Sequence, residues 1–498
     1  MNGRLPDHSV ADNGVTQELE RQPHLFLRLA ENALTVAESV RDNYLTNTAR
    51  FVRDVKGALA RTDPLFAVGN AATLGWADVQ GEVVTFIDGG VGQAQIASRM
   101  PILLRVGSYS VRTGERRLAE REHFGYYPIL LGDLEGGSKD RKDFVDIVRI
   151  TAELLGGLSA LERTPDLRVL MFHGPLVYLM NAYAGHTPFT ERDIDHFLHQ
   201  YAVDPSVGRA MKEEFLHQAK VYLYPCMVPD SSDLWATRRA FEPLAWIAYL
   251  YRRLLQEAAR RTPVPIIVGV VERGELTEFS RKVLLARVFE GLRAHGRAGY
   301  FNDLFGRHDL NKADAVVERL GYTDSLLLGM VLRPGQFSEP WSVDKYSGLR
   351  SGQAQLFDEA RPDQVKWNCL NPSTATGRQY GFPEVSGSYV HVSETTEPIR
   401  VEVFPTLGKN QIVDAVRRTH LYARLLPGYG FPVGLDIADK YAHVPAWLTD
   451  AYSKMIRYHL SVSLQRGEIA DVEMQRILTQ AIYMNPRDWL FRPDTGER

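Results

Sequence analysis

The run VVTFIDGG, residues 83–90, decides the fold class. Its first five residues are β-branched or aromatic, which is typical of a buried strand, and Asp88 follows them directly. Two glycines come next and are typical of a turn, so we expect the strand to end at the acid. A second apolar run, 167–172, also ends in a polar residue and a glycine, His173-Gly174. Open α/β sheets expose their chemistry at strand ends of this kind.

Helical and strand patterns extend this core in both directions. Apolar residues at helical spacing predict a helix over 141–163, which contains Glu153, and one or two amphipathic helices over 22–61. The remaining predictions are strands over 101–106, 265–271, 325–332 and 399–404 and helices over 276–295, 410–426, 432–443 and 446–483. Together these patterns predict an α/β protein with a mixed sheet flanked by helices.

The predicted elements divide the chain into four parts. Residues 1–20 are poor in apolar groups and are expected to form a flexible tail. Residues 21–65 are expected to form N-terminal helices that serve packing, dimer or partner contacts. Residues 66–184 and 263–498 would form the α/β core. Between its two segments, residues 185–262 are predominantly helical in pattern, and we interpret them as an inserted helical lobe.

Composition excludes several classes of protein. The 498 residues carry 58 Lys and Arg against 61 Asp and Glu, a formal net charge of −3, which excludes a globally basic nucleic-acid coat and makes any DNA contact local. The two cysteines, Cys226 and Cys369, cannot form a disulfide framework, and the first residues lack a secretory pattern, so we expect a cytoplasmic protein. The longest apolar stretch, 263–271, is less than half of the roughly 20 residues that span a bilayer, so no membrane insertion is expected.

Asp88 is the first candidate for a functional residue. An acid beside two glycines can hold a metal ion while a bulky polyanion approaches the backbone. An Asp-Gly pair is also an ordinary turn signal, and Glu153 can be a solvated helix acid. The local patterns therefore leave a purely structural interpretation open.

The order of motifs over 83–445 resembles that of the NurA family, nucleases that process DNA ends. The segments that carry the resemblance are Phe86-Ile87-Asp88-Gly89-Gly90, Thr151-Ala152-Glu153-Leu154-Leu155, Leu170-Met171-Phe172-His173-Gly174-Pro175-Leu176, Ile266-Ile267-Val268-Gly269-Val270-Val271, Val401-Glu402-Val403-Phe404-Pro405 and Tyr429-Gly430-Phe431-Pro432 with Ala438-Asp439. No single segment is diagnostic, and their order and spacing carry the resemblance.

The resemblance implies an RNase H-like core and a deoxyribonuclease that uses Mn²⁺ or Mg²⁺ held by clustered acids. It also implies a homodimer docked on a HerA-like hexameric ATPase, acting in DNA repair or in defence against phage. Phosphodiester hydrolysis needs an activated water and neutralisation of charge on the phosphate, which carboxylate-bound divalent ions supply. A net charge of −3 is compatible with this function, because the motor can deliver the DNA.

Carried over residue by residue, the resemblance assigns Asp88, Glu153 and Asp439 to the metal. His173 stands where active family members usually carry aspartate, and it would complete or tune the metal site. His443 lies four residues after Asp439, which is the same face of a helix, and is a candidate ligand or proton carrier beside a structural interpretation.

Three positions depart from the family pattern. His173 replaces an anionic ligand with imidazole, which accepts Mn²⁺ better than Mg²⁺, so we expect either a manganese preference or a loss of activity. Glu272-Arg273 stand where the family typically has lysine, and Arg273 is the neighbouring positive charge. Gly90 replaces a common serine. The alternative function is therefore a catalytically degenerate subunit that scaffolds or regulates the motor.

Other constellations are weaker. His196 and His199, with His186 and His217 nearby, are more typical of a charged helix surface than of a metal cluster. The glycines of 89–92 lack the Gly-Lys-Ser/Thr ending of a phosphate-binding loop, so no ATPase activity is expected. Arginines and aromatic residues interleave over 235–261, and we interpret them as a solvated face with core aromatics in preference to a DNA track.

Overall fold

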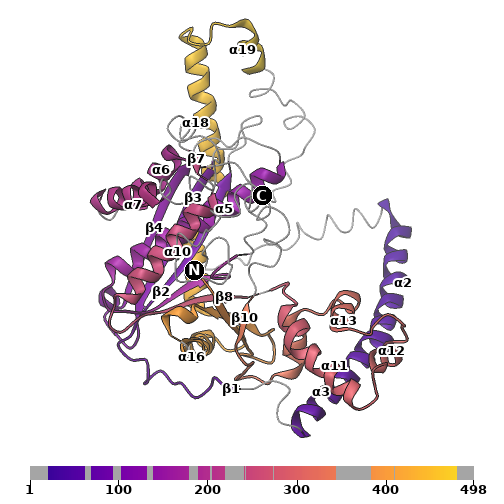
Figure 1. Cartoon of the computed structure of the whole chain (residues 1–498). Coiled ribbons are helices and arrows are strands. Elements are labelled where there is room, and N and C mark those ends of the chain that lie inside the picture. Colours follow the sequence, from indigo (N-terminus) through magenta and orange to yellow (C-terminus); the bar gives the residue numbers. More distant parts are fainter. Residues whose placement is uncertain are drawn as a thin grey trace, which may run out of the picture. The chain divides into compact units, whose positions relative to one another are not determined.

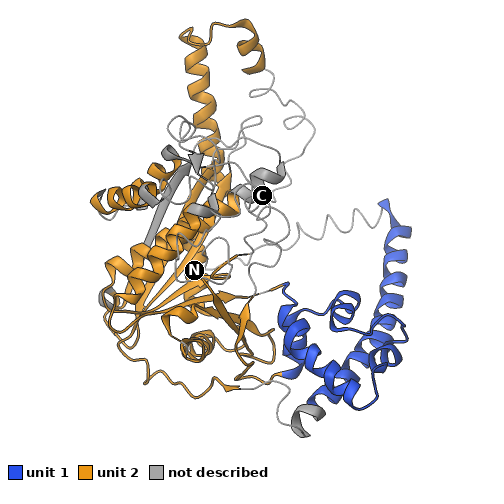
Figure 2. Cartoon of the chain, in the orientation of Figure 1, with its two compact units in different colours: residues 1–67, 275–331 blue, residues 68–274, 332–498 orange. Residues whose placement is uncertain are grey.

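The computed structural model (Figure 1) describes residues 21–61, 69–93, 102–131, 138–178, 189–201, 205–218, 240–241, 243–272, 274–343, 383–408 and 410–478. The chain divides into two compact units, residues 1–67 with 275–331 and residues 68–274 with 332–498 (Figure 2). This division differs from the predicted one, because the helices of 275–331 group with the N-terminal helices. None of the helices in the described part of the chain is long and apolar enough to cross a membrane.

The first unit is helical. Its elements are α2 (Pro23–Ser39), η1 (Val40–Leu45, a π-helix), α3 (Thr46–Arg61), η4 (Ser280–Leu284), α11 (Leu285–Ala294), α12 (Tyr300–Phe305), α13 (Ala313–Leu320) and α14 (Asp324–Val331). The prediction of a strand over 325–332 is wrong, since α14 occupies these residues. Asp324 in its first turn accepts hydrogen bonds from the backbone N–H groups of Phe279 and Ser280, at 3.1 and 2.7 Å. A short buried apolar run suits a buried helix as well as a strand.

The second unit is built on a ten-stranded mixed sheet. Its order is β1-β9-β11-β12-β8-β5-β2-β3-β4, with β10 also paired to β11. The strands are β1 (Gly69–Asn70), β2 (Val83–Gln93), β3 (Ile102–Arg112), β4 (Glu122–Leu131), β5 (Leu167–His173), β8 (Ile266–Val271), β9 (Gln336–Phe337), β10 (Trp341–Val343), β11 (Val385–Val390) and β12 (Ile399–Val403). β2, β3 and β4 form an antiparallel meander, and β5 and β8 run parallel to β2. The sheet confirms the predicted α/β class, and its centre has the RNase H-like order.

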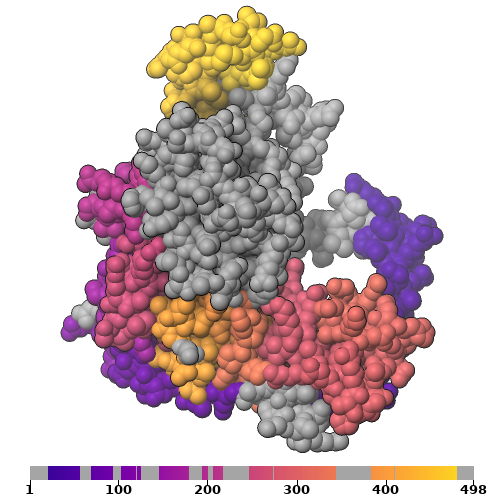
Figure 3. Space-filling view, viewed as in Figure 1, coloured from indigo at the N-terminus to yellow at the C-terminus, as the bar shows by residue number. Residues whose placement is uncertain are grey.

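Helices cover both faces of this sheet. α5 (Ser138–Arg163) and α10 (Pro243–Ala259) pack on one face, and α16 (Gln411–Ala423) and α17 (Val433–Ala442) pack on the other. The other elements are α4 (Leu118–Arg121), α6 (Glu191–Tyr201), α7 (Pro205–Gln218), η6 (Pro405–Leu407), α18 (Ala446–Gln465), α19 (Val472–Ile477) and a small sheet of β6 (Phe189–Thr190) with β7 (Ala240–Phe241). α10 packs against α5, so the last helix of the predicted lobe belongs to the core. Figure 3 shows α19 and part of α18, in yellow, at the surface.

The strand that carries Asp88 does not end there, contrary to the prediction. β2 stays paired with β3 as far as Gln93, whereas its pairing with β5 stops at Ile87. The two glycines therefore lie inside the strand. Gly90 lies against α17, since a Cβ added there would be 2.1 Å from the carbonyl oxygen of Ala442, and Gly89 lies against α5, since a Cβ added there would be 2.7 Å from Oε1 of Glu153. Glycine is needed here for close packing and not for a turn.

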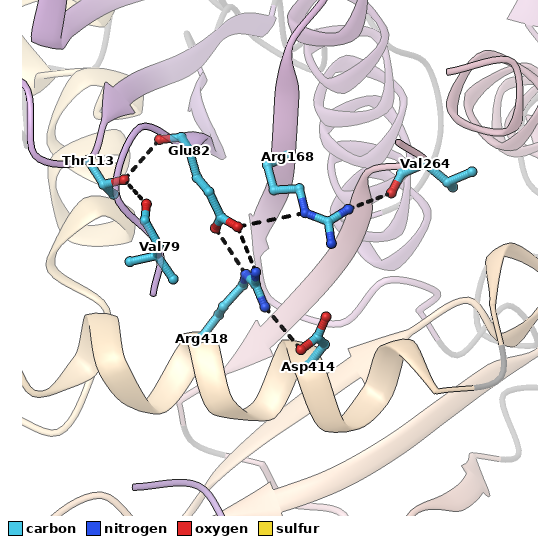
Figure 4. Close-up of polar contacts among 7 residues, drawn as sticks. All are labelled: Val79, Glu82, Thr113, Arg168, Val264, Asp414 and Arg418. Carbon is cyan, nitrogen blue, oxygen red and sulfur yellow. Dashed lines mark hydrogen bonds and ion pairs between the residues drawn. The ribbon is translucent and has the colours of Figure 1, made fainter. Parts of the chain in front are cut away.

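An ion-pair network closes the other end of β2 (Figure 4). Glu82, just before the strand, receives the guanidinium of Arg418 from α16, with Nη2 2.7 Å from Oε1 and Nε 3.2 Å from Oε2. Arg168 of β5 lies 3.8 Å from the same carboxylate, and Asp414 lies 3.1 Å from Arg418 Nη1. The Arg418 side chain is only 7% exposed. The network therefore links α16 to β2 and β5 through a largely buried arginine.

Replacing Arg418 with methionine is expected to lower the free energy of unfolding by about 3 kcal/mol, because a largely buried carboxylate loses its main partner. Arg424→Met, at the exposed end of the same helix, is the control and is expected to change it by less than about 0.5 kcal/mol. Urea denaturation followed by tryptophan fluorescence measures both values. Equal midpoints for the two variants would contradict a stabilising role of the network.

His420 on α16 links stability to pH. Its side chain is 2% exposed, and burial, helped by the charge of Arg424, lowers its pKa to about 4 from 6.5. Below pH 6.5 His420 takes up a proton in the unfolded chain but stays neutral in the folded chain. Its contribution to the free energy of unfolding is therefore complete above pH 6.5 and falls as the pH approaches 4. From about pH 7 to about pH 5 the parent should lose about 2 kcal/mol more stability than His420→Leu. Urea titrations at the two pH values measure this difference. If the parent and His420→Leu lost the same free energy of unfolding, His420 would not be the source of the pH dependence.

Candidate active site

Asp88 and His173 meet where β5 ends beside β2. Nδ1 of His173 lies 2.9 Å from Oδ2 of Asp88, and Oδ1 of Asp88 accepts a hydrogen bond from the backbone N–H of Gly89 at 2.7 Å. Asp88 is only 7% exposed. The turn predicted after His173 is confirmed, because Gly174 has a φ of +104°, a conformation that favours glycine. The end of β5 leaves one side of β2 open at Asp88.

The imidazole of His173 is held in a carboxylate environment. Burial lowers its pKa, but the hydrogen bond and charge of Asp88, with the charges of Asp439 and Glu153, outweigh burial and raise it. When the ring is protonated, it donates to Asp88 and the two side chains form an ion pair.

Asp439 reaches the same site from α17, the helix that packs on β2 and β3. Its pKa is raised by partial burial, by the charge of Asp88 and by hydrogen bonding with Asp88, while His173 opposes the rise. α17 can come this close because Gly107 lies beneath it: a Cβ there would be 2.2 Å from the carbonyl oxygen of Ala438. The structure therefore brings Asp88, His173 and Asp439 together.

Glu153 approaches from α5 on the other face of β2. Its side chain is 5% exposed, and Oε1 lies 2.8 Å from Nη1 of Arg149. Burial raises its pKa to about 7, with Asp88 adding to the rise and Arg149 opposing it. A Cβ at Gly89 would lie 2.7 Å from Oε1, so this glycine lets Glu153 reach the strand beside Asp88.

Two residues at this site were missed by the sequence analysis. Arg149 donates both to Glu153 and to the hydroxyl of Tyr178, at 3.1 Å, and its guanidinium lies 5.2 Å from the Tyr178 ring centroid. The four-residue spacing of Arg149 and Glu153 on a predicted helix is a signal that could have identified this pair. Nothing in the local sequence marks Tyr178.

His443 follows the last residue of α17, and its backbone N–H still donates to the carbonyl oxygen of Asp439 at 2.8 Å. α17 ends at Ala442, and His443 is its C-cap with ψ of 126°, two residues before Pro445. The histidine is exposed, and among the described residues no hydrogen bond or ion pair joins its ring to Asp88, Glu153 or His173. Its role as a ligand or proton carrier stays a prediction.

More acids surround the site. Burial and a hydrogen bond with Asp436, followed by the charges of Glu272 and Asp439, raise the pKa of Tyr429 to about 12. The charge of Glu272, the second departure from the family pattern, therefore acts on Tyr429. Positions of the sequence analysis that lie outside the described residues are His186, Cys226, Trp235, Arg273 and Cys369.

The donor set fits a hard divalent cation in its chemistry. Carboxylates from separate elements and one imidazole are ligands that suit Mn²⁺. Burial first, and then the charge of Asp88, raises the pKa values of Glu153 and Asp439, and a bound cation would lower both. Within the described ranges no three His, Cys, Asp or Glu side chains are arranged round one ion. Asp88 and Glu153 would have to turn from His173 and Arg149 to share one.

Comparisons with known proteins give one family. A family model described as the NurA domain matches residues 82–444. Similar solved structures include the NurA nuclease from Sulfolobus solfataricus, with 11% identity, 87% of this chain and 98% of that chain covered and a TM-score of 0.43. They also include NurA with manganese, with 10% identity, 87% and 97% covered and a TM-score of 0.37. A search of curated proteins finds no match.

Proposed function

The chain belongs to the NurA family, whose model spans 82–444, and we propose that it is a metal-dependent deoxyribonuclease that processes DNA ends. The observation that carries the proposal is the meeting of Asp88, His173 and Asp439 at the open side of β2. Acids coupled in this way are typical of sites that hold cations against a phosphate.

The residues that would hold Mn²⁺ or Mg²⁺ are Asp88, Asp439 and His173, with Glu153 across β2. When bound, the ion would neutralise charge on the scissile phosphate and lower the pKa of water. The backbone N–H of Gly89 fixes the orientation of the Asp88 carboxylate. The side chain of Arg149, 23% exposed, opposes the rise in the pKa of Glu153 and presents a positive charge to a phosphate.

The proposal extends to partners. We infer a cytoplasmic homodimer that works with a HerA-like hexameric ATPase in DNA repair or antiviral defence. Support comes from α2, which has no buried residue and leaves Leu27 and Leu34 each 63% exposed, as a partner-binding helix would. The net charge of −3 is compatible with this partnership, since a motor can deliver DNA to a chain that is not globally basic.

The alternative is a catalytically degenerate subunit that scaffolds or regulates the motor, and the features that favour it are His173 and Glu272. Digestion of linear duplex DNA with Mn²⁺ or Mg²⁺, with and without the partner ATPase, separates the two functions. A nuclease shortens or nicks the duplex under at least one of these conditions. Intact DNA under all of them would leave the scaffold as the function.

The identity of residue 173 should set the metal preference. We expect His173→Asp to raise the cutting rate in Mg²⁺ relative to Mn²⁺ by about 10-fold, because a carboxylate suits Mg²⁺ better than imidazole does. Initial rates on linear duplex DNA in each metal measure the ratio. His196→Asp on α6, a histidine away from the acids, is the control and should leave it unchanged. An unchanged ratio in His173→Asp would contradict a role of His173 at the metal.

A further inference from the structure

A buried ion pair lies on β12, a strand to which the proposed function gives no role. The side chains of Arg400 and Glu402 are both buried, and Nε of Arg400 donates to Oε1 of Glu402 at 2.8 Å. Their neighbours Val401 and Val403 belong to the apolar core that α16 and α17 complete. Because successive residues of a strand face opposite sides, the pair lies on the face that α5 and α10 cover.

Fold stability alone does not account for this pair. Burying two charges costs free energy, and apolar residues of similar size often stabilise a core as well or better. Nη1 of Arg400 is also buried without a hydrogen bond to any residue that the structure describes. A second contact of Glu402 gives a reason for the carboxylate.

Glu402 binds the backbone of the segment 174–178, which directly follows His173. Its Oε2 accepts a hydrogen bond from the N–H of Leu176 at 2.9 Å, and the carbonyl oxygen of Leu176 accepts one from the hydroxyl of Tyr251 on α10 at 2.5 Å. Leu176 is buried and lies in no strand, so side chains must satisfy these backbone groups. Two side chains from separate elements therefore fix the middle of the segment.

Gly269 of β8 makes room for this contact. It is paired with Glu402 in the sheet, and a Cβ added there would lie 2.7 Å from the backbone nitrogen of Leu176 and 2.9 Å from the carbonyl oxygen of Gly174. The segment 174–178 therefore packs directly over a glycine, and the carboxylate on the neighbouring strand meets its N–H.

Both ends of the segment 174–178 belong to the acid site. His173, one of the residues that would hold the metal, directly precedes it. Tyr178 ends it, and the Tyr178 hydroxyl accepts a hydrogen bond from Nη1 of Arg149 at 3.1 Å. The same nitrogen of Arg149 donates to Glu153 at 2.8 Å. A displaced segment would therefore disturb the site from two sides.

We propose that Glu402 is a positioning residue of the acid site. Its carboxylate, held by Arg400, fixes the N–H of Leu176 and in this way sets the positions of His173 and Tyr178. This role rests on the proposed function, whereas the fixing of the segment can be measured without metal or DNA.

Two double variants isolate the contact between Glu402 and Leu176. Arg400→Met/Glu402→Gln and Arg400→Met/Glu402→Leu each remove both charges, so neither variant leaves a buried charge unpaired. Glutamine can still accept from the N–H of Leu176, and leucine cannot. In EDTA, amide hydrogen exchange over 174–178 should be about 5-fold faster with leucine than with glutamine, while exchange over 411–423 should be equal. Linear duplex DNA in Mn²⁺ should be cut about 5-fold more slowly with leucine than with glutamine.

Tyr251→Phe tests the same segment without changing the buried charges, and it decides the matter if the double variants do not fold. It removes the hydroxyl that binds the carbonyl oxygen of Leu176, so exchange over 174–178 should rise and cutting should slow, each by about 3-fold. Tyr249→Phe is the matched control, because this buried tyrosine of the same helix bonds Glu214 and Met211 instead. It should leave both rates at the parent's values.

Equal exchange over 174–178 in the glutamine and leucine variants would overturn the proposal, as would faster exchange with leucine at an unchanged cutting rate. Equal exchange in Tyr251→Phe and Tyr249→Phe would do the same. A parent that cuts no DNA with either metal would contradict the proposed function instead. The exchange comparison would then still decide whether Glu402 fixes the segment.

Discussion

Asp88→Asn is expected to cut linear duplex DNA at least about 10³-fold more slowly than the parent, because the site loses the charge at its centre. Asparagine has nearly the same shape, and its carbonyl oxygen can still accept from the N–H of Gly89. It cannot form the ion pair with His173 or supply an anionic ligand. Initial rates in Mn²⁺, with the partner ATPase where it is required, measure the loss.

Asp450→Asn is the control for this variant, because Asp450 is an exposed acid on α18. It makes the same chemical change and should keep the parent's rate. A similar rate for Asp88→Asn and the parent would place the chemistry elsewhere. Equal losses in both variants would point to overall acidity, and not to a local site.

Gly107→Ala is expected to lower the free energy of unfolding by about 3 kcal/mol and to abolish most cutting. The new Cβ would lie 2.2 Å from the carbonyl oxygen of Ala438 and 2.7 Å from the backbone nitrogen of Ala442. Both atoms belong to the backbone of α17, so the helix itself must move, and Asp439 moves with it. Urea denaturation and initial cutting rates measure the two effects.

Gly291→Ala is the matched control, because a Cβ at this position of α11 would have nothing within 4 Å. Alanine inside a helix should leave stability unchanged or raise it by up to about 1 kcal/mol, and cutting should not change. If Gly107→Ala matched Gly291→Ala in stability and in cutting rate, the packing of α17 against β3 would not position Asp439.

The central strands and the acid site could be predicted because their signals are local. A β-branched run followed by a polar residue and glycine marked both Asp88 and His173, and the structure joins these side chains at 2.9 Å. Asp439 came from the family resemblance, and α17 brings it to Asp88. The predictions of residue roles in catalysis stay predictions until activity is measured.

The wrong predictions share a physical cause, which is packing between distant segments. The glycines after Asp88 suggested a turn, but Gly89 makes room for Glu153 of α5, and Gly90 makes room for α17, more than 300 residues later in the chain. The run over 325–332 is apolar enough for a strand. It forms the helix α14 instead, because it packs within the helical unit. None of these partners is adjacent in sequence.

The central claim is that Asp88, Asp439 and His173 hold one divalent ion. Crystals of the chain soaked in Mn²⁺ and measured at the manganese absorption edge test it most directly. The account predicts an anomalous peak within about 2.5 Å of carboxylate oxygens of Asp88 and Asp439 and of a His173 ring nitrogen. The peak should be absent in Asp88→Asn. No peak at these residues, at a Mn²⁺ concentration that supports cutting, would contradict the account.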